Sequence, residues 1–181
     1  MSNLAIIRAY GLHYAEGMAA LRTQKPDETA KHLEALLKLA ADPAMEKLTV
    51  WDRYPLLHAV NIAKLNLFAE IVASNDDKVG AIKTMREAVA IEDRIPYDEP
   101  PGWHAPTRHS LGVFLLDDGK AVEAEKVYRE ELARNPENGW SLFGLAQSLR
   151  AQKRDTDAAE VDKRFIEAWK NADVKLTASR F

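Results

Sequence analysis

The sequence predicts an all-α fold, a right-handed helical-hairpin solenoid of about eight helices in four hairpins. Apolar residues recur at helical spacing along most of the 181-residue chain. The second half contains one helix–turn–helix pattern twice, and prolines, glycines and Asn/Asp pairs separate the periodic stretches. Because a single hairpin cannot bury its apolar side alone, we expect the hairpins to stack on one another.

The internal repeat occupies residues 107–170. A shift of 34 residues places Leu111 on Leu145 and Leu115 on Leu149. Where two antiparallel helices cross closely, only small side chains fit, and larger apolar ones fill the space beside the crossing. The small residues expected at the crossings are Gly112, Ala124, Ala146 and Ala158.

The first two hairpins are expected near residues 4–41 and 56–94. The first helix has a broad apolar face that includes Leu4, Ile7 and Leu12, which we expect to point inward, and its glycines favour close packing. A helical turn that starts at Asp42-Pro43 and runs through Leu48 and a connector at Trp51–Pro55 link the two hairpins. The four helices expected here are Leu4–Arg22, Pro26–Ala41, Leu56–Ser74 and Lys78–Arg94.

Ile95–Pro106 is the irregular part of the chain. It holds four prolines and one glycine in 12 residues, and such prolines do not permit a helix. We expect it to fold back as an ordered segment that buries Trp103 against the first helix of the third or fourth hairpin, because flanking prolines lower the entropy lost on ordering.

The last two hairpins are expected near residues 107–134 and 140–172, and the whole of 1–181 is interpreted as a single domain. Residues 173–181 are too few for another repeat, so we expect them to cap the last hairpin. The four helices expected here are Thr107–Asp117, Ala121–Arg134, Trp140–Ala151 and Asp155–Ala172.

Composition excludes several functional classes. The chain is 46% hydrophobic and 29% charged, which is typical of a globular protein, and its net charge of −3 gives no basic footprint for nucleic acid. With no cysteine there is no disulfide, thiolate metal site or cysteine nucleophile. We expect no cofactor and no membrane partner, and a cytoplasmic location, since neither a membrane-spanning run nor a signal peptide is visible.

The repeat also carries a family pattern, W-x2-L-G-x2-Y followed by A-x3-F and P. The residues that match it in the first copy are Leu111, Gly112, Leu115, Ala124, Tyr128 and Pro136. The chain therefore resembles tetratricopeptide-repeat proteins. More narrowly it is similar to the C-terminal part of longer bacterial members, on residues 96–101, Trp103, 108–112, 135–147 and 177–181.

This resemblance implies a non-enzymatic scaffold that binds a protein or peptide in a concave groove. The groove residues that it implies are Asn66, Glu70, His109, Val113, Trp140, Phe143, Gln147 and Arg150. Trp103 is added to them because residues 95–106 are expected to run along the groove. A carboxylate clamp of Lys and Asn is not expected, because other residue types stand at its positions. Trp140 and Phe143 either anchor a partner or pack against residues 95–106. The partner's identity stays open, and the exposed ends of the solenoid are candidates for self-association.

The alternative is a metal-binding or hydrolytic module at Asp98, Glu99, His104 and His109, four groups within 12 residues. Carboxylates and imidazoles bind borderline metals, and a histidine beside a carboxylate can act as a general base. The two histidines are five residues apart across a helix start, however, rather than at the i, i+4 spacing that aligns ligands. We therefore rank the scaffold first and interpret the remaining histidines, His13, His32 and His58, as boundary residues on separate helices.

Overall fold

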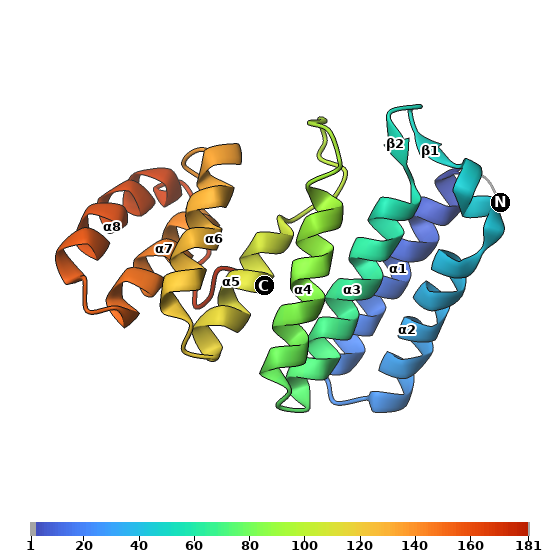
Figure 1. Cartoon of the computed structure of the whole chain (residues 1–181), viewed down its shortest axis with the longest axis horizontal. Coiled ribbons are helices and arrows are strands. Elements are labelled where there is room, and N and C mark those ends of the chain that lie inside the picture. The colour runs from blue at the N-terminus through green and yellow to red at the C-terminus, as the bar shows by residue number, and fades with distance from the viewer. Residues whose placement is uncertain (1–2, 181) are drawn as a thin grey trace. The chain divides into compact units, whose positions relative to one another are not determined.

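A computed structural model of the protein describes residues 3–180. Over this range the chain forms eight α-helices, which confirms the all-α class, and the first and second, third and fourth, fifth and sixth, and seventh and eighth helices pack as hairpins (Figure 1). The chain divides into two compact units, Met1–His104 and Ala105–Phe181. The single-domain interpretation stays a prediction, and Phe181 at the end of the expected cap lies outside the described residues.

The first unit contains two helical hairpins. Its α-helices are α1 (Asn3–Arg22), α2 (Pro26–Ala41), α3 (Leu57–Ser74) and α4 (Lys78–Glu92). The connector after α2 is a 3-10 turn, η1 (Pro43–Lys47), followed by an antiparallel ribbon of two short strands, β1 (Thr49–Val50) and β2 (Tyr54–Pro55). Both α2 and η1 begin at a proline. The first amide hydrogens of a helix have no acceptor within it, so a proline, which has no amide hydrogen, is favoured there, and both elements begin where the sequence predicts.

The core of the first unit is built around α3, which packs on α1, α2 and α4. Its side chains are apolar on nearly all sides, as expected of a buried helix. One cluster joins Leu36, Ile62, Ala63, Leu67 and Trp103, and a second joins Ile6, Met45, Leu56 and Val60.

The inward face of α1 differs from the one expected. Leu4, Ile7 and Leu12 are 57%, 39% and 54% exposed, whereas Ile6 and Ala20 are buried. Apolar residues lie on more than one side of α1, so its periodicity alone did not decide which side meets the core. The glycine at position 17 marks a close approach, because a Cβ there would lie 2.6 Å from Leu67 Cδ2. Position 11, the other glycine of this helix, has no such neighbour.

The irregular segment is ordered, but it packs elsewhere than expected. Trp103 is 6% exposed and lies within the first unit, with its ring centroid 5.1 Å from that of Tyr14 and 6.4 Å from that of Tyr10 on α1. The guanidinium of Arg53 holds the preceding stretch by donating to Asp98 Oδ1 and to the carbonyl oxygen of Tyr97, each at 2.7 Å. The expectation that Trp103 packs on the third or fourth hairpin is therefore wrong.

The second unit contains the two regular hairpins. Its helices are α5 (Thr107–Asp117), α6 (Ala121–Arg134), α7 (Gly139–Ala151) and α8 (Asp155–Trp169). The four small residues of the repeat are buried, as the crossing argument requires. Helix α7 begins one residue early because the side chain of Asn138 caps it and accepts from the Ser141 amide at 3.1 Å. Helix α8 ends at Trp169, before the predicted Ala172.

Candidate functional site

Tyr128 organises the second unit. Its ring, from α6, passes between Gly112 on α5 and Gly144 on α7, where an added Cβ at either glycine would lie 2.2 Å from Tyr128 Cζ. The side chain is fully buried, and this burial raises the pKa of the Tyr128 hydroxyl. The Tyr128 hydroxyl therefore stays protonated and is able to form hydrogen bonds.

The C-terminal tail binds to that hydroxyl. Ser179 Oγ lies 2.6 Å from the Tyr128 hydroxyl oxygen and donates to the carbonyl oxygen of His109 at 3.2 Å. Leu176 is buried, and the Arg180 guanidinium lies 4.6 Å from the centre of the Phe114 ring. These contacts anchor the tail on the third hairpin, and Trp169 Nε1 of α8 donates to the carbonyl oxygen of Val174 at 2.7 Å, so the tail also contacts the last hairpin.

His109 fastens α5 to α7. Its Nε2 lies 2.8 Å from Ser141 Oγ, and its side chain is buried. Desolvation lowers the pKa of His109 to about 4, so the imidazole is neutral at physiological pH. A buried side chain with a buried partner supports packing and is not presented to a ligand.

Helices α7 and α8 share a half-buried aromatic cluster. Trp140 meets Trp169 edge-on at 5.4 Å between ring centroids, and Phe143 lies 5.6 Å from Phe165. These contacts hold the two α7 rings against α8. Farther along α7, Gln147 is half-buried and the exposed guanidinium of Arg150 pairs with Asp162.

The structure buries several of the groove residues implied by the resemblance. Asn66 is 5% exposed and donates its side-chain amide to the carbonyl oxygen of Ile62 at 2.9 Å, within its own helix. Trp103, His109 and Val113 are also buried. The residues that keep exposed surface are Glu70, Trp140, Phe143, Gln147 and Arg150.

The four groups of the alternative site each have other partners. Asp98 pairs with Arg53, and Glu99 accepts from the hydroxyl of Tyr97. The ring centroid of His104 lies 4.6 Å from that of Trp103, while His109 bonds to Ser141. These different partners give the alternative no support.

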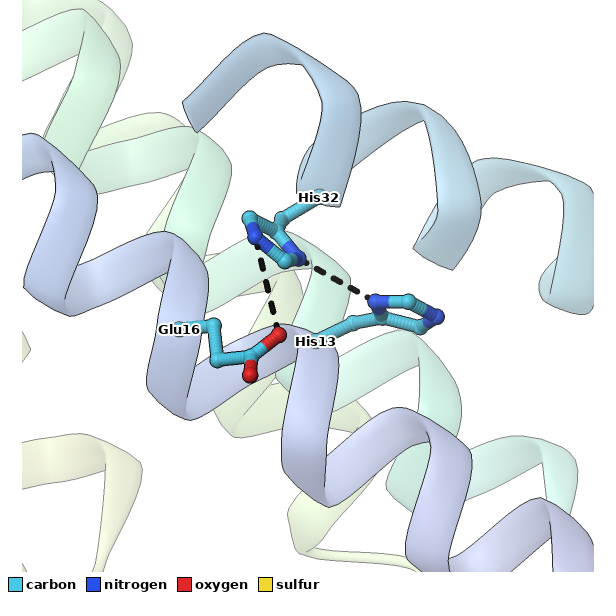
Figure 2. Close-up of side chains that lie close together, drawn as sticks. All are labelled: His13, Glu16 and His32. Atoms are coloured by element: carbon cyan, nitrogen blue, oxygen red, sulfur yellow. Dashed lines mark hydrogen bonds and ion pairs between the residues drawn. The ribbon is translucent and has the colours of Figure 1, made fainter. Parts of the chain in front are cut away.

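A different group of side chains does come together. His13 and Glu16 on α1 and His32 on α2 each offer a ligand atom within 4.8 Å of the other two (Figure 2). Burial lowers the pKa of His13, and nearby His32 adds to the effect. Sequence reasoning missed this group because it treated the histidines one helix at a time. The available signal was the three-residue spacing of His13 and Glu16 beside an antiparallel partner helix.

None of the helices within residues 3–180 is long and apolar enough to cross a membrane.

Residues 111–173 match a family model described as tetratricopeptide repeat. Among solved structures, the chain is similar to one titled "Crystal structure of MamA protein", with 12% identity and a TM-score of 0.50. This match covers 93% of the chain and 98% of the MamA chain and concerns the fold alone. No curated protein sequence matches the chain. Residues 111–173 therefore match the tetratricopeptide repeat, and the helical hairpins of the chain are similar in fold to those of the MamA structure.

Proposed function

We propose that the chain is a protein-interaction scaffold without chemistry of its own, and that it binds an extended segment of a partner protein along α7. Tetratricopeptide folds generally mediate protein–protein interaction, which supports the class of function. The site itself is argued from the second unit, where the chain's own tail is bound.

The observation that carries this proposal is that the C-terminal tail is bound to the second unit. A non-helical stretch is fixed there by Ser179 on a tyrosine hydroxyl and a backbone carbonyl, and by Arg180 over an aromatic ring. Hydrogen bonding to backbone groups together with side-chain anchoring is the way in which extended peptides are recognised. This supports a surface on the second unit that accepts a peptide.

Helix α7 carries partly exposed side chains that a partner could contact. Trp140, Phe143, Gln147 and Arg150 follow one another at spacings of three, four and three residues, so they share one face of the helix. Aromatic residues and arginine are the side chains that most often dominate binding energy at interfaces. Because α8 already orders the two rings, a partner would lose less entropy on binding them. Glu70 on α3 stays a predicted contact in the first unit.

A site-specific photocrosslinker at Gln147 tests this proposal in the full chain, produced in its native cells. The matched control places the same group at Val122, which is 69% exposed on α6. We expect a discrete protein adduct from position 147 that is absent from position 122 and is lost when Phe143 is changed to alanine. Identical adducts from both positions, or none from position 147, would show that α7 is not the binding surface.

Self-association through the ends of the solenoid stays a prediction. Ile166 and Val174 are 66% and 52% exposed in the second unit, and Leu4 and Leu12 are exposed on α1. We keep the cytoplasm of a bacterium as the proposed location. Sedimentation velocity over a range of concentrations tests the self-association: a single monomeric species at all concentrations would contradict it.

A further inference from the structure

The surface of the first unit carries a cluster of side chains that partner binding does not use. His13 and Glu16 lie on the same face of α1, and His32 points toward both from α2 (Figure 2). The Nδ1 atoms of the two histidines are 3.1 Å apart, and His32 Nε2 is 3.6 Å from Glu16 Oε2. These three residues lie close together although 19 positions separate the histidines in sequence.

The crossing of α1 and α2 fixes this arrangement. A Cβ at Gly17 would lie 3.1 Å from His32 Cβ, so the two helices approach closely beside the cluster. Leu67 of α3 packs under the same glycine, which ties the crossing to the core. The ligand atoms are therefore carried by helices rather than by loops, which is the arrangement that holds a metal site in place.

The distances suit a metal ion. Bonds of about 2.0–2.1 Å from a tetrahedral Zn²⁺ to two imidazole nitrogens place those nitrogens roughly 3.3 Å apart. The observed 3.1 Å between the histidine Nδ1 atoms is close to this separation. His32 would use Nδ1, since one ion takes one nitrogen from each ring. The Glu16 side chain is 51% exposed and has the freedom to turn its carboxylate to the same ion.

We propose that His13, Glu16 and His32 form a three-ligand site for Zn²⁺ or a similar divalent transition-metal ion. Two imidazoles and one carboxylate suit such borderline ions, whereas Ca²⁺ and Mg²⁺ prefer all-oxygen sites. Three protein ligands leave at least one coordination position for water. An ion bound here bridges two helices and therefore stabilises the first hairpin.

Titration of the untagged full chain with Zn²⁺ above neutral pH, followed by calorimetry, tests this site. We expect one equivalent to bind, and we expect His13→Gln and His32→Gln each to weaken the affinity by about 10-fold or more. The matched control is His58→Gln, which changes a histidine of α3 in the same unit and should leave the affinity unchanged. Absence of a one-equivalent site in the unchanged protein would overturn the proposal.

A second measurement keeps the test independent of folding. Co²⁺ bound by two imidazoles and a carboxylate absorbs visible light, and this absorption should appear in the unchanged protein and in His58→Gln but not in His13→Gln. Zn²⁺ should also raise the unfolding temperature of the unchanged protein and not that of His13→Gln. If His13→Gln, shown by its circular dichroism to be folded, keeps both responses, the ion binds elsewhere and the proposal is wrong.

Discussion

The Tyr128 hydroxyl and the Ser179 hydroxyl lie 2.6 Å apart across 51 residues of sequence. The Ser179 hydroxyl donates its hydrogen bond to the carbonyl oxygen of His109. In the bond between the two hydroxyls, the tyrosine is therefore the donor and Ser179 the acceptor. The family pattern has phenylalanine at the tyrosine position, where no hydroxyl needs a partner. In this chain the tail supplies that partner, and the ring between Gly112 and Gly144 connects α5, α6, α7 and the tail.

Tyr128→Phe should lower the free energy of unfolding by roughly 0.5–1.5 kcal/mol, the usual value of one internal hydrogen bond. It should also free the tail, so that trypsin cleaves faster after Lys175. The control is Tyr97→Phe, because Tyr97 is 78% exposed and its hydroxyl donates to the surface residue Glu99. Equal cleavage rates in the unchanged protein and Tyr128→Phe would mean that this bond does not hold the tail.

Gly144→Ala should destabilise the second unit by roughly 1–3 kcal/mol, since the new methyl group overlaps the Tyr128 ring. Gly11→Ala is the opposite case, because nothing lies within 4 Å of a Cβ there. It should stabilise α1 by about 0.5–1 kcal/mol through helix propensity. Urea unfolding of both variants measures the two changes in unfolding free energy. Changes of the same sign would contradict the position of the Tyr128 ring between Gly112 and Gly144.

Local signals in the sequence were enough for the helices. The prolines at the starts of α2 and η1 and the Asn138 cap act through their own backbone groups, so the elements begin at or within one residue of the predicted positions. The 34-residue period likewise records packing between neighbours in sequence. These features depend on contacts within one hairpin or between consecutive hairpins.

Contacts over longer separations could not be predicted in the same way. Trp103 could pack against any exposed apolar surface within reach, and the structure places it on Tyr10 and Tyr14 of α1. The tail has no periodicity, so nothing in it indicated that Ser179 would bind Tyr128. The resemblance implies groove positions for Asn66 and His109, but their burial depends on neighbours that a single sequence does not reveal.

Trp103→Ala should cost about 3–5 kcal/mol of stability in the first unit, because it empties a cluster that includes Leu36 and Leu67. The control is Trp51→Ala, since Trp51 is 67% exposed and its loss should change stability by less than about 0.5 kcal/mol. Chemical unfolding monitored by circular dichroism gives both values. A small effect at Trp103 would contradict its place in the core.

His109 should make the second unit sensitive to acid. Its pKa is about 4 in the folded chain and near 6.5 when unfolded, so as pH falls through 6.5 only the unfolded chain takes up the proton. Stability is therefore full above 6.5 and is lost on the way down to about 4. At pH 5 this loss amounts to about 2 kcal/mol.

His109→Gln cannot be protonated and can still bond to Ser141, so its unfolding free energy should fall less between pH 7 and pH 5. The control is His58→Gln, in the other unit, which should leave the acid sensitivity of the second unit unchanged. If His109→Gln and the unchanged protein lose the same stability over this interval, His109 is not the group that senses the acid.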